Sequence, residues 1–332
     1  MAADLRPGTR EVHHARFRSM GSEAHVIVVD GRPSLLSVAR RRLGELEACW
    51  SRFIPTSEIS TCNRLAGTPV WVSADTALLI DTAIEGWHLS AGRFDPTVLG
   101  DVLRAGYDLS FDELDGRPEW LRPAPPMLRR GCGEIAIERH PDGTAVVTMP
   151  DGIGFDPGGV GKGLAADLVV DALMAAGAAG ACVNLGGDLA VRGVGPHGGG
   201  WTITVEGPSA DDPPVTDVAL ASGAVATSTT ARRRWMADGV SQHHLIDPLT
   251  GEPSASDVVQ VTVLAATAWA AEVLAKTSLL RGRMGVFDLL DDRHHAGLAV
   301  TDDGTVMTTP SLARFTGAAD DTVRIHGTQA AA

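Results

Sequence analysis

The chain has 332 residues, of which 44% are hydrophobic, a composition that excludes wholesale disorder and leaves enough apolar surface for a sizeable core. Its formal net charge of −13 argues against nucleic acid and anionic membranes as partners, because both require clustered lysine and arginine. The one basic run, residues 232–234, is more typical of a solvated turn than of a docking patch.

The first half of the chain predicts two amphipathic helices that follow a strand. Alternating and β-branched residues indicate the strand, and apolar residues at helical spacing indicate the helices, of which the second has Ser73 as its cap. In chain order we expect a loose tail (1–15), a strand (17–30), helices (34–53 and 75–91), an irregular proline-rich excursion (110–131) and a hairpin (138–149).

The second half predicts short strands interrupted by two helices. In chain order we expect a glycine-rich turn (155–162), a helix (163–176), a strand with a glycine turn (181–193), strands (201–208, 218–229, 243–247, 258–265), a helix (266–282) and a frayed end (318–332). Because the pattern is neither regular βαβ alternation nor all-β, we predict an α+β or mixed α/β fold. We expect a single domain over 16–317, formed by two packed lobes.

The stretch FDPGGVGKGLAAD raises the question of a phosphate site. A P-loop is excluded, because Asp156 stands where the first glycine should be and Gly163 stands where Ser or Thr should be. The dinucleotide fingerprint G-x-G-x-x-G is matched only weakly. Glycines before a helix N-terminus still favour anion binding, and Lys162 adds a full positive charge. The alternative is a tight strand-to-helix turn with a solvent-facing lysine.

Two further motifs bear on the same question. VNLGGD carries Gly186, Gly187 and Asp188, which alone favour a hairpin or bulge but would form a second wall if they lay beside the first turn. HHLIDPLTG carries His243 and His244, and neighbouring residues on a strand point in opposite directions. We therefore expect at most one of the two histidines to face a site, and no two-histidine metal pair.

Cysteine spacing and the lack of long apolar runs favour a cytoplasmic protein. The four cysteines form no C-x-x-C pair, so we expect reduced thiols rather than disulfides or a zinc site. The N-terminal stretch shows no apolar segment typical of a signal peptide, and no run of 18 apolar residues could span a membrane.

Five groups of segments follow one another along the chain: FRSMGS, FIPTSEISTCN, GRFDPTVLGDVL, FDPGGVGKGLAAD with VNLGGDL, and ATSTT…HHLIDPLTG…VTVLAATAWAAEVLAK. Taken in this order, they resemble the ApbE-like family of FAD:protein FMN transferases. The resemblance implies an α+β flavin transferase fold with FAD in a cleft between two lobes. It also implies magnesium-assisted transfer of FMN to a Ser or Thr of an acceptor protein that carries a motif like D-x-x-[ST]-G-A-[ST], with release of AMP.

The resemblance also assigns roles to individual residues. His244 is the expected general base or acceptor-orienting group, with Lys162 and Lys276 as the other catalytic candidates. The expected FAD-binding residues are Met20, Phe53, Arg93, Phe94, Asp95, Asp156, Lys162, Gly186, Gly187, Asp188, Ser228 and Ile246. Core packing is the alternative role for Met20 and Phe53. Asp247 and Thr250 are expected to shape the turn that follows His244.

The sequence differs from the family pattern at the positions of the implied magnesium ligands. The family pattern A-D-A-L-A-T uses its Asp and Thr as magnesium ligands, and Glu272 and Lys276 stand at those positions here. The remaining implied ligands are carbonyls at Gly159 and near Ala275. A protonated lysine cannot ligate a metal, so Lys276 either forms an ordinary salt bridge with Glu272 or partly replaces the charge of the metal.

Two further functions remain open on the sequence. A FAD pyrophosphatase that gives FMN and AMP would use the same cleft with water as the acceptor. A flavin-binding protein without catalysis is the other alternative, and the lysine at position 276 motivates it.

Overall fold

The computed structural model describes residues 10–114, 127–237, 239–316 and 325–326. Its central element is an eight-stranded sheet in which every neighbouring pair is antiparallel. Across the sheet the strands run β1 (Val12–Ser19), β2 (Ser22–Val29), β6 (Gly180–Leu185), β7 (Asp188–Gly193), β10 (Gly223–Thr229), β15 (Val258–Ala265), β16 (Ala296–Thr301) and β17 (Val306–Thr308).

Both faces of this sheet are buried. In β2, Val26 and Val28 point into a core beneath the helices, whereas Ile27 and Val29 point into a second core on the opposite face. This alternation follows from the period of two in a strand. The second core is closed by a three-stranded sheet of β18 (Ile325–His326), β8 (Trp201–Val205) and β9 (Thr216–Leu220), with Trp201 fully buried.

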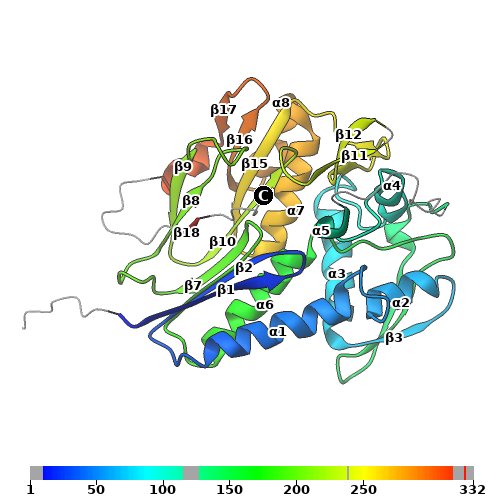
Figure 1. The fold of residues 1–332 in the computed structure, drawn as a ribbon, viewed down its shortest axis with the longest axis horizontal. Helices are drawn as coiled ribbons and strands as arrows, with labels where there is room; N and C mark the ends of the chain where they lie inside the picture. The colour runs from blue at the N-terminus through cyan, green and yellow to red at the C-terminus, as the bar shows by residue number, and fades with distance from the viewer. Residues whose placement is uncertain (1–9, 115–126, 238, 317–324, 327–332) are drawn as a thin grey trace, which may run out of the picture.

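Helices cover the other face and build a second lobe. Figure 1 shows α6 and α7 against the sheet, while α2 to α5 gather to one side of it, beyond the end of α1. The longer helices are α1 (Leu35–Trp50), α2 (Glu58–Arg64), α3 (Ala74–Leu89), α6 (Gly161–Ala175) and α7 (Ala268–Leu280), and the short ones are α4 (Leu99–Arg104), α5 (Phe111–Leu114), α8 (Gly282–Gly285) and α9 (Asp288–Asp291).

The remaining elements are short. The second lobe holds a three-stranded sheet of β3 (Val70–Val72), β5 (Ala145–Thr148) and β4 (Ala136–Arg139). Two hairpins lie near the join of the lobes, β11 (Arg234–Ala237) with β12 (Val240–His243) and β13 (Ile246–Asp247) with β14 (Glu252–Pro253). The described residues also form two 3-10 turns, η2 (Cys132–Glu134) and η3 (Pro310–Arg314).

Helices α6 and α7 are locked together at their N-termini. A Cβ on Gly163 would lie 2.5 Å from the carbonyl oxygen of Ala268, so only glycine allows this approach. The Asp167 carboxylate accepts hydrogen bonds from the N–H groups of Ala268 and Trp269 at 2.8 to 3.1 Å and thereby caps α7. Burial raises the pKa of Asp167 to about 6. These contacts fix the register of the two helices.

The structure confirms the α+β class and changes several details. The strand expected over 17–30 is the hairpin β1–β2, which turns at Met20 and Gly21 and begins at Val12, inside the expected tail. Strands β16 and β17 were not predicted, and β18 lies in the expected frayed end. Most of the proline-rich excursion lies outside the described residues. Within the part that is described, no helix is long and apolar enough to cross a membrane.

Candidate active site

Two cavities meet between the lobes and share one wall. The first has a volume of about 360 Å³ and the second about 670 Å³, both within the range of small-molecule sites. We call the residues that line both of them the shared wall: Gly21, Phe111, Gly158, Lys162, Arg233, His244 and Lys276. A long ligand could therefore lie across the wall with one end in each cavity.

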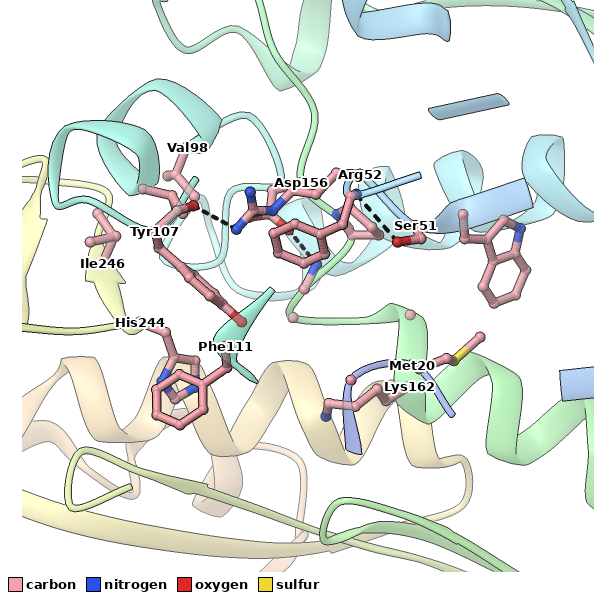
Figure 2. Close-up of a pocket in the computed structure, with 18 of the residues that line it drawn as sticks. Met20, Ser51, Arg52, Val98, Tyr107, Phe111, Asp156, Lys162, His244 and Ile246 are labelled. Carbon is pink, nitrogen blue, oxygen red and sulfur yellow. Dashed lines mark hydrogen bonds and ion pairs between the residues drawn. The ribbon is translucent and has the colours of Figure 1, made fainter. Parts of the chain in front are cut away.

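Separate elements deliver the charged groups of the shared wall. Lys162 lies in the first turn of α6, and Lys276 lies on α7. Arg233 precedes β11 and has a positive φ of 51°, and His244 lies between β12 and β13. Figure 2 shows Lys162 and His244 pointing into the same pocket. Because α6 and α7 are locked in register, the two lysines are held at a fixed spacing.

Lys162 is held by two carboxylates. Its Nζ pairs with Asp188 and lies 3.3 Å from Oε1 of Glu272. The other oxygen of Glu272 accepts a hydrogen bond of 2.9 Å from the N–H of Gly163. Burial lowers the pKa of Lys162, and the negative charge of Glu272 opposes that change. The glycine-rich turn thus carries a paired lysine and not a solvent-facing one.

The second glycine motif is both a hairpin and part of the site. Gly186 and Gly187 have φ values of +64° and +98°, as the two-residue turn between β6 and β7 requires. The turn lines the second cavity and brings Asp188 to Lys162. The two motifs therefore form neighbouring walls.

Lys276 extends along α7 to the turn before α6. Its Nζ lies 3.5 Å from the carbonyl oxygen of Gly158 and 5.9 Å from the centroid of the Phe94 ring. A Cβ on Gly159 would lie 2.3 Å from this nitrogen, so the glycine makes room for the ammonium. Burial lowers the pKa of Lys276, against the opposing charges of Glu272 and Asp156. The ammonium occupies the space beside the glycine turn.

His244 is the histidine that faces the cavities. Its Nδ1 is buried and has no hydrogen-bond partner among the described residues. Burial, then the positive charges of Arg233 and Lys276, lower the pKa of His244 well below 6.5. His243 points elsewhere: its Nε2 lies 3.0 Å from the carbonyl oxygen of Ser254. Of the two histidines, His244 alone lines the two described cavities.

An arginine that contacts two aromatic rings lines the first cavity. Arg52 lies over the rings of Phe53 and Tyr107, with its guanidinium carbon 4.0 Å and 4.8 Å from their centroids. Its Nε lies 3.2 Å from Asp156, and both side chains are nearly buried. Trp235 continues the stack 5.3 Å from Tyr107. Figure 2 shows Arg52 between Tyr107 and Asp156.

The structure gathers nearly all of the sequence-predicted site residues. Ala275, which is fully buried, lines neither cavity. The first cavity is lined by Met20, Phe53, Arg93, Phe94, Asp95, Asp156, Gly159 and Ile246, and the second by Gly186, Gly187, Asp188, Ser228 and Glu272. Arg93 is engaged by Asp247 at 3.3 Å and by the carbonyl of Leu280, so it ties the end of α3 to the turn after His244.

Sequence reasoning missed Arg52, Tyr107 and Arg233. The basic run at 232–234 is not a solvated turn: Arg233 lines both cavities and donates to the hydroxyl of Ser22 at 2.7 Å. Its neighbour Arg232 lies 3.3 Å from Glu206. The available signal was the run itself, which follows ATSTT directly.

The described residues do not fit a divalent metal ion. Both oxygens of Glu272 are engaged, by Lys162 and by the N–H of Gly163. Lys276 occupies the space beside Gly159, the carbonyl of which is an implied ligand. No group of three or more His, Cys, Asp or Glu side chains within the described ranges could hold a metal. Two ammonium groups would repel a divalent cation at this position.

Comparisons with known proteins agree with this architecture. A curated FAD:protein FMN transferase of Vibrio cholerae is 30% identical over 248 residues, which cover 73% of this chain and 72% of that protein. One from Haemophilus influenzae is 25% identical and covers 87% of each chain. The sequence profile of the ApbE family matches residues 20–301.

Solved structures share the fold. An ApbE protein of Thermotoga maritima has a TM-score of 0.79 at 24% identity and covers 93% of this chain and all of its own. The flavin transferase ApbE of Vibrio cholerae has a TM-score of 0.76 at 26% identity and covers 92% of this chain and 99% of its own. The chain therefore belongs to the ApbE family.

Proposed function

We propose that this chain transfers the FMN half of FAD to a serine or threonine hydroxyl of an acceptor protein and releases AMP. The observation that carries the proposal is the shared wall, where Lys162, Arg233 and Lys276 surround His244 at the junction of two cavities. A dinucleotide has two bulky ends joined by an anionic diphosphate. Each cavity can hold one end of the dinucleotide, and the cations between the cavities can bind its diphosphate.

The step breaks one phosphorus–oxygen bond and forms another. The acceptor hydroxyl oxygen attacks the phosphorus of the FMN half, and the bridging oxygen leaves with its electron pair as part of AMP. The hydroxyl proton passes to His244, which is neutral at pH 7 because its pKa lies well below 6.5. The cations stabilise the charge that develops on the phosphoryl oxygens. Because the described residues do not fit a divalent ion, no step is assigned to magnesium.

We also place the protein in the cytoplasm. The four cysteines, Cys49, Cys62, Cys132 and Cys182, are free thiols, and three of them are buried. Burial raises the pKa of Cys132 and of Cys182 to about 12, which keeps them as unreactive thiols. Such thiols suit a reducing compartment. Fractionation of the native host with an antibody would test this location.

The function is tested by measuring AMP release from FAD. A peptide with the pattern D-x-x-[ST]-G-A-[ST] is compared with the same peptide in which the Ser or Thr acceptor is alanine. We expect AMP release and a peptide heavier by one FMN only with the hydroxyl peptide. Equal AMP release with both peptides would indicate hydrolysis, and bound, intact FAD without AMP would indicate a carrier.

A His244→Gln variant is the matched control for the base. Glutamine keeps the polarity and approximate size but accepts no proton, so we expect transfer to fall about 100-fold or more while FAD still binds. Unchanged transfer in this variant would remove His244 from the mechanism.

A further inference from the structure

Lysine is very rare in this chain, and both copies lie on the shared wall. Of the 28 Lys and Arg residues, only Lys162 and Lys276 are lysines. Elsewhere the chain uses arginine for its positive charge. Lysine differs from arginine in carrying a compact point charge on a flexible stem. A compact cation is the kind of group that could stand where a small metal ion would otherwise sit.

The two lysines differ in how their charge is balanced. Lys162 pairs with Asp188 and Glu272. Lys276 and Arg233, by contrast, have no carboxylate within 4.0 Å among the described residues. Lys276 reaches only the carbonyl of Gly158 and the face of the Phe94 ring. The shared wall therefore holds two half-buried cations that form no ion pair with a described carboxylate.

An unbalanced cation in a partly buried site is costly unless a ligand supplies the opposite charge. The diphosphate of a dinucleotide carries one negative charge on each phosphate. Its charge is opposite in sign to that of Lys276 and Arg233, which form no ion pair with a described carboxylate.

We propose that Lys276, together with Arg233, replaces the divalent metal at the diphosphate, so that this chain binds FAD through fixed cations and needs no magnesium. The inference rests on the proposed function only for the identity of the ligand. The Lys276 ammonium occupies the space beside Gly159, and Glu272 spends its carboxylate on Lys162 and on the N–H of Gly163. The Lys276 ammonium thus occupies the position of the metal, and other groups of the chain already engage the acidic ligand.

Isothermal titration calorimetry of FAD binding tests the proposal. FAD is titrated into the full chain in EDTA and, separately, in excess MgCl2, and riboflavin serves as the ligand without phosphate. We expect FAD affinities that agree within about twofold in the two buffers. An affinity for FAD that rises tenfold or more with magnesium would overturn the proposal. No FAD binding in either buffer would instead overturn the proposed function.

Variants at Lys276 separate charge from structure. We expect Lys276→Met to weaken FAD binding about tenfold or more in EDTA, the usual effect of losing a hydrogen bond to a charged group, and to leave riboflavin binding unchanged. In Lys276→Thr, which frees the space and supplies a hydroxyl oxygen, we expect magnesium to recover part of the lost FAD affinity.

Arg41→Met is the matched control, because it removes the same charge from an exposed position on α1 outside both cavities. It should bind FAD like the parent chain. If Lys276→Met also bound FAD like the parent, or if it lost FAD and riboflavin affinity equally, the assignment of Lys276 to the diphosphate would be wrong.

Discussion

At the residue scale, the glycines of FDPGGVGKG make room for protein groups. A Cβ on Gly159 would displace the Lys276 ammonium and the Phe94 ring, and a Cβ on Gly163 would strike the backbone of Ala268. The sequence suggested that these glycines let the backbone approach a phosphate. The structure shows that they also let a lysine and a helix approach the turn.

The depressed pKa of His244 predicts an unusual pH profile. A general base must be unprotonated, and with a pKa well below 6.5 the neutral imidazole persists into mildly acidic solution. We therefore expect kcat/KM for FMN transfer to stay level from about pH 6.5 to pH 8 and to fall only at more acidic pH. Initial rates at subsaturating FAD in a constant-ionic-strength buffer series would measure the profile.

The parameter kcat/KM is chosen because it reports the free enzyme, whereas bound diphosphate would raise the pKa of the imidazole. A profile that already loses tenfold per pH unit between pH 7 and pH 6.5 would contradict the assignment of this limb to His244. A chain that carries Arg41→Met should reproduce the parent profile.

Much of the site was predictable at this scale, because motif residues lie close together in the sequence. Lys162, Asp188 and His244 were all recognised from short patterns, and all three line the second cavity. Arg52 and Tyr107 were missed because their pairing joins segments 55 residues apart. Only the folded second lobe brings that guanidinium over the ring, and no local pattern marks it.

At the element scale, one carboxylate joins the two helices that carry the lysines. Asp167 on α6 caps the first N–H groups of α7, so Asp167→Ala leaves the N–H groups of Ala268 and Trp269 buried and unpaired. We expect the free energy of unfolding to fall by about 1–3 kcal/mol, the usual cost of a lost cap or an unsatisfied donor. Urea titration followed by circular dichroism would measure the change.

Asp171→Ala is the matched control on the same helix. Asp171 is exposed and pairs only with Arg192 at 3.2 Å, so we expect a loss below about 1 kcal/mol. Equal losses in the two variants would show that the Asp167 cap contributes no more than a surface ion pair.

Helices and hairpins were predicted correctly where a capping or turn residue marks the end of the element. The Ser73 hydroxyl accepts a hydrogen bond from the N–H of Thr76 as the predicted cap of α3, and Asp142-Gly143 turns the β4–β5 hairpin. The prediction failed at 17–30 because Met20, a residue that rarely adopts positive φ, shares the turn of the β1–β2 hairpin with Gly21. Strands β16 and β17 were also missed, because they are stabilised by pairing with β15 and with each other in the sheet and not by a pattern in their own residues.

At the scale of the whole molecule, positive charge is concentrated at the shared wall although the chain as a whole is acidic. The chain carries a net charge of −13, yet three cations meet at the shared wall. A cationic cavity within an acidic molecule selects ligands by where their charge is located. A dinucleotide can place its anionic centre at the wall, whereas a polyanion such as nucleic acid meets an acidic surface.

Because the chain has only two lysines, cleavage after lysine can report how often the helices that carry them unfold locally. A protease that cuts only after lysine could cleave this chain at two bonds, after Lys162 and after Lys276, and both lie inside helices. Cleavage requires those helices to unwind, so its rate measures how often α6 and α7 open in the native state.

We expect the folded chain to resist such a protease, and added FAD to slow cutting further because bound ligand stabilises the closed helices. Gel electrophoresis over time would follow the fragments 1–162, 163–276 and 277–332. An arginine-specific protease, which has exposed targets outside helices and strands such as Arg293, serves as the comparison. Rapid cleavage after lysine at a rate that FAD does not change would mean that α6 and α7 open frequently and that FAD does not stabilise their closed state.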